Sequence, residues 1–198
     1  YDTVYAAPYL ENIPKAKYAV FSPAFHVEGE EKAGEIYAPF FNRTPEHFSS
    51  HMQTPPSEEV IGPLVTFGKD GAYISYEIFS EYASEGRHIN RQIFTEVCNR
   101  LLGDRKTLET DLLSQGTVTL SYQPTEHRYV VHLVYGSPIK RGSIQVIEDL
   151  PPLYNVVLTL RIQNEIERAY LAPSGEQLQC LREGGAVRIA VPEVSCHQ

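Results

Sequence analysis

The stretch Pro39-Phe40-Phe41-Asn42-Arg43-Thr44-Pro45-Glu46-His47-Phe48-Ser49-Ser50-His51 gathers phenylalanine, histidine, arginine and proline within a few positions. Proline fixes the φ angle and removes a backbone donor, so this run, with Thr54-Pro55-Pro56 after it, suits neither a helix nor a strand interior. We predict an ordered loop. Its structural motif comprises Phe40, Phe41, Asn42, Arg43, His47, Phe48, Ser49 and His51.

Side-chain chemistry suggests how this loop is held. We expect its phenylalanines, Phe40, Phe41 and Phe48, to anchor it in the core, because large aromatic side chains gain most from burial. We expect Arg43 and His51 to hold its backbone by hydrogen bonds. The loop then serves the architecture and is not itself a reactive centre.

Around the loop, up to residue 115, strand-like runs alternate with helical periodicity. Residues 3–10 and 17–21 resemble short strands, and residues 60–67 and 72–76 flank the turn Gly68-Lys69-Asp70-Gly71 as in a hairpin. This glycine pair joins two strands and does not open a helix, so we predict no nucleotide or other cofactor.

Two helices are predicted in the same part of the chain. Residues 89–102 carry apolar side chains at four-residue steps, and Gly103 is placed to end the helix. A shorter helix is predicted over residues 77–84, closing at Gly86. We therefore assign residues 1–115 to an α/β domain.

Beyond Gly116 nearly every segment has the pattern of a β-strand. Residues 118–122 and 144–148 alternate with period two, and further short runs follow, separated by proline, glycine, asparagine or charged residues. Short strands at this spacing are typical of a small antiparallel β-sandwich. We assign residues 116–198 to such a domain.

Composition excludes several function classes. The chain has 198 residues with 17 basic and 25 acidic side chains, and a net charge of -8 opposes binding to nucleic acid. No apolar run approaches the roughly 20 residues of a membrane span, which predicts a soluble protein without a membrane partner. Met52 is the only methionine, so we expect Tyr1 to be a cut end.

Individual residues offer little catalytic chemistry. His47 and His51 are spaced as for one helix face, but only Glu46 and the more distant His26 offer a third ligand. Pro45 and Ser49-Ser50 also suit a long helix poorly, and we predict no metal site. Ser49 and Ser50 lack the strained G-x-S-x-G elbow in which a nucleophilic serine often sits. Cys98 falls within the predicted helix, away from an N-terminus that would activate its thiol. No pair of carboxylates stands out for glycoside chemistry.

Three motifs taken together resemble one enzyme family. They are Tyr37-Ala38-Pro39-Phe40-Phe41-Asn42-Arg43-Thr44, His47-Phe48-Ser49-Ser50-His51 and Gln53-Thr54-Pro55. They resemble the C-terminal half of bacterial glycoside hydrolases similar to the family 42 β-galactosidases and the alpha-L-fucosidase-like enzymes. The β-strand runs that follow residue 116 resemble the terminal β domain of these enzymes.

The resemblance implies a specific architecture and role. Residues 1–115 would be the second half of a flavodoxin-type, amidotransferase-like trimerisation domain, and residues 116–198 the terminal β domain. The catalytic barrel of such enzymes is not in this chain, so the resemblance transfers no catalytic residue. Residues 22–35 fit no core element of this plan. The compartment implied is a bacterial cytoplasm or periplasm.

Three functions remain open at this point. The first is a non-catalytic accessory and oligomerisation region whose partners are the catalytic barrel and further copies of the chain. The second is a carbohydrate-binding module that uses the tyrosine-rich β domain or the loop at residues 39–56. The third is an independent hydrolase or amidotransferase that uses Ser49, Ser50 or Cys98.

Overall fold

The structure, a computed structural model, describes Tyr1 and residues 3–198 and divides into two compact units, Tyr1–Gly103 and Asp104–Gln198. The division precedes the predicted boundary between residues 115 and 116. The reason is the short strand β6 (Leu108–Thr110), which pairs with β11 (Leu153–Leu160) of the second unit.

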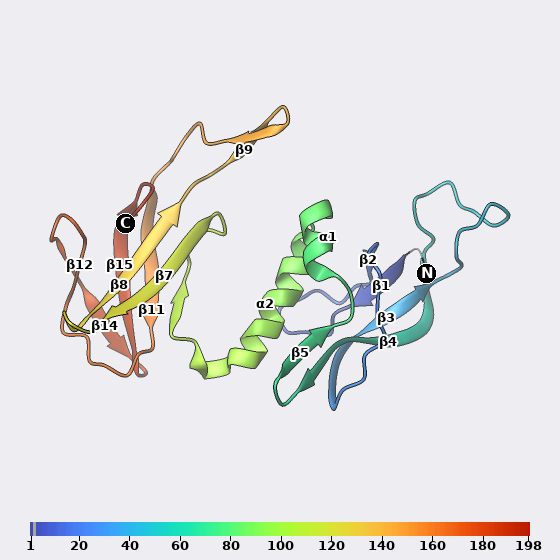
Figure 1. Cartoon of the computed structure of the whole chain (residues 1–198), viewed down its shortest axis with the longest axis horizontal. Helices are drawn as coiled ribbons and strands as arrows, with labels where there is room; N and C mark the ends of the chain where they lie inside the picture. Colours follow the sequence, from blue (N-terminus) through green and yellow to red (C-terminus); the bar gives the residue numbers. More distant parts are fainter. Residues whose placement is uncertain (2) are drawn as a thin grey trace. The chain divides into compact units, whose positions relative to one another are not determined.

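The first unit is built on a five-stranded sheet in the order β2-β1-β3-β4-β5 (Figure 1). Its strands are β1 (Val4–Ala7), β2 (Tyr18–Val20), β3 (Glu31–Pro39), β4 (Pro56–Gly68) and β5 (Gly71–Ile74). All the strand pairs are antiparallel, whereas a flavodoxin-like layer needs parallel strands joined by long crossovers. The predicted flavodoxin-like layer is therefore not found in this sheet. The predicted hairpin at residues 60–76 is β4 and β5.

Residues 31–35 open the central strand β3, although we expected them to fit no core element. Glu31 pairs with Phe67 and Ala33 with Val65, and the acidic run before them obscured this strand in the sequence. Gly34 has φ +71°, and a Cβ there would lie 2.7 Å from the carbonyl oxygen of Ala7. Glycine is thus required for β1 to lie this close to β3.

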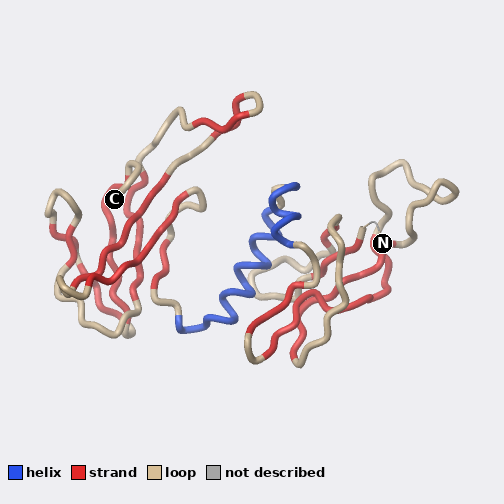
Figure 2. Tube along the Cα trace, viewed as in Figure 1, coloured by secondary structure: helices blue, strands red, loops and turns tan. Residues whose placement is uncertain are grey.

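Two helices supply the rest of the core of the first unit: α1 (Ile78–Glu85) and α2 (His88–Leu102), with a 3-10 turn η1 (Gly103–Arg105) after them (Figure 2). Both agree with the sequence prediction within two residues. Gly86 ends α1 in the left-handed conformation, and its N–H donates to the carbonyl of Tyr82.

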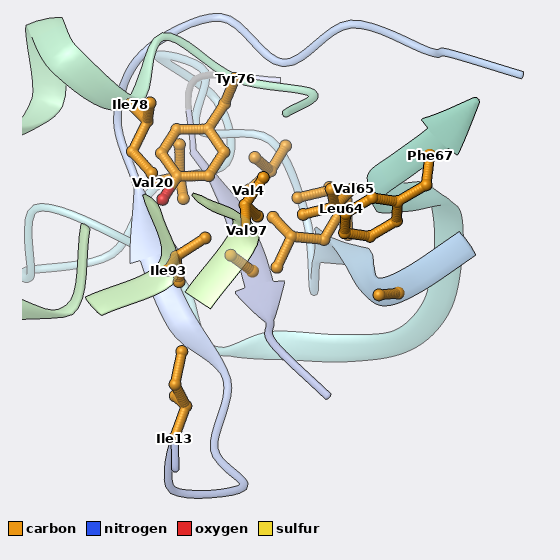
Figure 3. Close-up of a cluster of buried hydrophobic side chains, with 13 residues drawn as sticks. Val4, Ile13, Val20, Leu64, Val65, Phe67, Tyr76, Ile78, Ile93 and Val97 are labelled. Atoms are coloured by element: carbon orange, nitrogen blue, oxygen red, sulfur yellow. The ribbon is translucent and has the colours of Figure 1, made fainter. Parts of the chain in front are cut away.

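The helices bury one face of each against the sheet. Ile78, Ile93 and Val97 pack with Leu64 and Val65 in one hydrophobic cluster (Figure 3). Ile93, Leu64 and Val65 are completely buried. Burial of side chains of this size supplies most of the stability of the unit.

A buried carboxylate ties α1 to the chain that follows β2. Glu81 is 3% exposed, and its Oε1 accepts hydrogen bonds from the backbone N–H groups of Phe21 and Ser22, each at 2.5 Å. The Arg87 guanidinium lies 3.9 Å from Oε2, donates to the carbonyl of Ala19 and covers the Phe21 ring. One acidic side chain thus organises a segment without regular structure.

The second unit consists of small antiparallel sheets. A four-stranded sheet has the order β14-β15-β11-β6, and three further pairs are β7-β8, β9-β10 and β12-β13. Besides β6 and β11, the strands are β7 (Gly116–Gln123), β8 (Arg128–Tyr135), β9 (Ile139–Arg141), β10 (Ile144–Val146), β12 (Ala169–Tyr170), β13 (Gln177–Leu178), β14 (Cys180–Glu183) and β15 (Ala186–Val194). The predicted antiparallel, β-rich character is confirmed.

One hydrophobic cluster joins the four-stranded sheet of this unit to the β7–β8 pair. Leu133 and Tyr135 from β8 meet Val156 and Leu158 from β11 and Ile189 from β15. Alternation along each strand directs these side chains inward and leaves their neighbours, such as Val134, exposed.

Glu109 on β6 should make the second unit sensitive to acid. Hydrogen bonds from Lys106, at 2.9 Å, and from Arg161 lower the pKa of the Glu109 carboxyl. A carboxylate whose pKa is lowered on folding stabilises the fold above its unfolded pKa, about 4.3. That contribution is lost as the pH falls through the lowered value. We therefore expect Glu109→Gln to be less stable than the parent at pH 7, with the difference shrinking as the pH falls below the unfolded pKa.

Urea titrations at pH 7, 4 and 3 measure this difference. Glu183→Gln is the matched control, because Glu183 lies in the same unit and its contact with Arg188 is longer, at 3.8 Å, and more exposed. Equal pH dependence in the two variants would argue against a role for Glu109.

Candidate functional site

The predicted loop occupies residues 40–55, between β3 and β4, and extends away from the sheet of the first unit (Figures 1 and 2). The Phe40 N–H donates to the carbonyl of Pro55 at 2.8 Å, and the Thr54 hydroxyl donates to the carbonyl of Phe41 at 2.9 Å. The buried Tyr5 hydroxyl donates to the Thr54 carbonyl from below. These bonds close the base of the loop.

A second set of contacts orders the interior of the loop. Thr44 and His47 exchange backbone hydrogen bonds in a tight turn, and the Thr44 hydroxyl also accepts from the His47 N–H at 3.0 Å. Arg43 spans the loop, with its Nη1 donating to the carbonyl of Met52 at 2.6 Å. The conformation is therefore specified by its own polar residues.

The aromatic side chains are placed differently from our expectation. Phe41 is partly buried, and its ring stacks on His47 with centroids 3.8 Å apart. Phe40 and Phe48 are 73% and 71% exposed, and Met52 is 79% exposed. The expected anchoring of the loop by Phe40 and Phe48 is wrong, because both rings are exposed to solvent. Hydrogen bonds at the base of the loop attach it to the sheet instead.

The loop does not assemble a nucleophile. The Ser49 hydroxyl donates to the backbone carbonyl of His51 at 3.1 Å and not to its ring. The hollow at the base of the loop has a volume of only about 10 Å³, enough for one water. Its lining residues are Thr3, Pro39, Phe41, Asn42, Arg43, Gln53 and Thr54. His47 is engaged with Phe41.

The structure also gives no catalytic or metal-binding geometry to the other residues considered from the sequence. Cys98 lies inside α2, and burial raises the pKa of its thiol, which disfavours the nucleophilic thiolate. Among Tyr1 and residues 3–198, no three or more His, Cys, Asp or Glu side chains gather where they could bind one metal ion together. The two helices described there are also too short and too polar to cross a membrane.

A polar cluster that we did not predict lies around Tyr37. The Tyr37 hydroxyl donates to Glu35 at 2.5 Å, and the Tyr9 hydroxyl lies 3.1 Å from both groups. The hydrogen bond to Glu35 is the main cause of a raised pKa at Tyr37, so this phenol stays protonated. Lys17 lies over the Tyr37 ring at 3.8 Å and forms an ion pair with Glu58 at 3.0 Å. Glu35 and Tyr37 are two residues apart on β3, so their side chains lie on the same face of the strand. This spacing was the sequence feature that could have predicted the cluster.

A groove that we also did not predict runs along α2. Its volume is about 190 Å³, and it lies between residues 12–13 and one face of the helix. The lining residues are Asn12, Ile13, His88, Arg91, Gln92, Thr95 and Glu96.

Comparison with known proteins finds a similar structure but no matching family. The chain matches no protein-family model and no curated protein. Among solved structures it is related to a region of a glycoside hydrolase. That structure is alpha-L-fucosidase isoenzyme 2 from Paenibacillus thiaminolyticus, with 34% sequence identity and a TM-score of 0.92. The match covers 100% of this chain and 31% of the fucosidase chain, so the chain spans about a third of the length of that protein.

The comparison supports only part of the predicted resemblance. It supports a relation to a glycoside hydrolase, and it does not single out the family 42 β-galactosidases. The match over a third of the fucosidase fits an accessory part of such an enzyme.

Proposed function

We propose that this chain is a non-catalytic accessory region of an alpha-L-fucosidase-like glycoside hydrolase, with the catalytic barrel outside these residues. The observation that carries the proposal is the match over the full chain to a third of a fucosidase. The loop geometry agrees with it, because Ser49 and His47 are engaged in structural contacts. Burial raises the pKa of the Cys98 thiol in α2, which disfavours its use as a nucleophile. Nothing in this role requires a cofactor.

Two experiments test this proposal. Hydrolysis of nitrophenyl α-L-fucoside and β-D-galactoside by the 198-residue chain should stay at the buffer rate. Turnover that is lost in a Glu35→Gln or Ser49→Ala variant would contradict a non-catalytic role. The coding sequence upstream of Tyr1 provides the second test, because a barrel-coding region is expected there.

Oligomerisation is part of the same proposal. The outer strands β2 and β5 of the first sheet each have one neighbour, and such edges tend to pair with another chain unless they are protected. Sedimentation of the chain over a range of concentrations should show self-association. A strict monomer at high concentration would remove this part of the proposal and leave the accessory role intact.

A carbohydrate-binding role is the second candidate, and the exposed aromatics favour it. Phe40 and Phe48 stand in solvent on an ordered loop that also carries Arg43, and exposed aromatic rings can stack on a sugar ring while a guanidinium binds its hydroxyls. In the second unit, Tyr122 and Tyr129 form a ring pair with centroids 4.7 Å apart.

Calorimetric titration with fucose, galactose and short oligosaccharides tests this candidate. If the loop binds sugar, Phe48→Ala should abolish the heat signal and Tyr122→Ala should preserve it. The opposite result would place binding on the β domain, and a flat titration of the parent chain would remove the candidate.

A further inference from the structure

Two histidines from distant parts of the sequence meet on the surface of the second unit. His132 lies on β8, and His197 lies in the segment that follows β15. Backbone hydrogen bonds hold this segment against β8: Leu133 and Gln198 exchange two, at 2.8 and 2.9 Å, and the Tyr135 N–H donates to the Cys196 carbonyl at 2.6 Å. His197 is bridged to Val134, two positions from His132, so both imidazoles project from the same face of the ladder.

The two rings are in direct contact through nitrogen. Nδ1 of His132 lies 3.1 Å from Nε2 of His197, the ring centroids are 5.3 Å apart, and the planes deviate by 16° from parallel. In the neutral pair one nitrogen donates its hydrogen to the lone pair of the other. The ladder therefore holds together two metal-ligating atoms that are 65 positions apart in sequence.

We propose that His132 and His197 form a binding site for a divalent transition-metal ion such as Zn²⁺ or Ni²⁺. Two imidazole nitrogens, each ~2.0–2.1 Å from one ion, stand roughly 2.9–3.4 Å apart, depending on the coordination angle. The observed separation of 3.1 Å lies in that range. Both side chains are exposed, so the rings can turn until their lone pairs converge on the ion.

The chemistry of binding is balanced without loss of a proton. In the metal-free pair the donor ring carries its hydrogen on the nitrogen that faces its partner. On binding, that ring moves the hydrogen to its other nitrogen, and both facing nitrogens then present lone pairs to the ion. The ion replaces the N–H···N hydrogen bond between the rings with two coordinate bonds.

The donor set determines which ions the site can hold. Imidazole binds zinc, nickel and copper and leaves calcium and magnesium to oxygen ligands. Cys196 does not join the site, because among Tyr1 and residues 3–198 no third His, Cys, Asp or Glu side chain gathers with these two histidines. Two protein ligands leave the remaining positions of the ion to water, which makes the site exchangeable.

Isothermal titration of the chain with zinc chloride and with nickel chloride at pH 7.5 tests the proposal. We expect one ion per chain, and a fall in affinity of about tenfold or more in both His132→Gln and His197→Gln. His127→Asn is the matched control. His127 lies in the turn of the same β7–β8 hairpin with φ +49°, a conformation that asparagine tolerates, and this variant should bind like the parent.

A second measurement locates the ion. Paramagnetic Ni²⁺ should broaden the amide NMR signals of residues 131–133 and 196–198 before those of residues 26, 47, 51 and 88. Binding that is unchanged in either glutamine variant, or no binding by the parent chain, would overturn the proposal. Broadening centred on His47 and His51 would overturn it as well. These outcomes are independent of the proposed function, because the site makes no use of a catalytic or sugar-binding role.

Discussion

Replacing Glu81 with alanine is expected to lower the free energy of unfolding of the first unit by about 3–5 kcal/mol. The substitution removes the acceptor for the N–H groups of Phe21 and Ser22 and leaves Arg87, which contacts the same carboxylate, without it. Buried donors that lose their partner bear the full cost of desolvation. Equilibrium denaturation with urea, followed by tyrosine fluorescence and by circular dichroism, measures the change.

Two further variants separate the possible causes of this loss. Glu81→Gln keeps one oxygen acceptor for the two N–H groups and removes the charge, so its effect should be intermediate. Glu85→Ala is the matched control, because Glu85 lies 3.4 Å from the same Arg87 and is 43% exposed, and it should cost less than about 1 kcal/mol. A loss in Glu81→Ala no larger than that in Glu85→Ala would show that the buried contacts are not stabilising.

The second large effect is expected at Leu133, in the core of the other unit. Leu133 is 2% exposed and joins the cluster formed by β8, β11 and β15. Leu133→Ala removes buried methyl groups and leaves a cavity, which costs about 2–5 kcal/mol. Hydrogen exchange of the amides of residues 153–160 should accelerate by a corresponding factor.

Val134 provides the comparison on the same strand. It is 47% exposed, so Val134→Ala removes little buried surface and should change stability by less than about 1 kcal/mol. Similar losses in the two variants would mean that β8 does not have the inward and outward faces described for it. The Glu81 variants should leave exchange in residues 153–160 unchanged if each unit is stabilised by its own core.

Local pattern was sufficient for the elements whose signal is contained in a short window. The four-residue apolar steps from Ile89 to Leu101, with Gly103 after them, predicted α2, and the turn at residues 68–71 predicted the hairpin of β4 and β5. The alternation beyond residue 116 likewise predicted the β-rich second unit. In each case the deciding interactions lie between residues close in sequence.

Such local patterns did not predict the direction of the strands or which strands pair with each other. A strand has the same alternation whether its neighbour is parallel or antiparallel, so the resemblance supplied a flavodoxin-like layer that the antiparallel sheet of the first unit does not have. For the same reason the sequence did not reveal that residues 31–35 occupy the centre of that sheet. No local sequence pattern marks the role of Glu81, because the N–H groups that it binds are 59 and 60 positions away.

The loop from Pro39 to His51 illustrates both sides of this division. Its prolines were enough to predict an ordered loop, because proline restricts the local backbone. The relation to glycoside hydrolases came from the resemblance of its motifs to those of known enzymes and not from this restriction. Which of its rings are buried was decided by tertiary contacts. Tyr5 and Thr54 close the base of the loop and leave Phe40 and Phe48 exposed. The pairing of His132 with His197 was likewise decided by the fold, because only the ladder along β8 brings these two rings together.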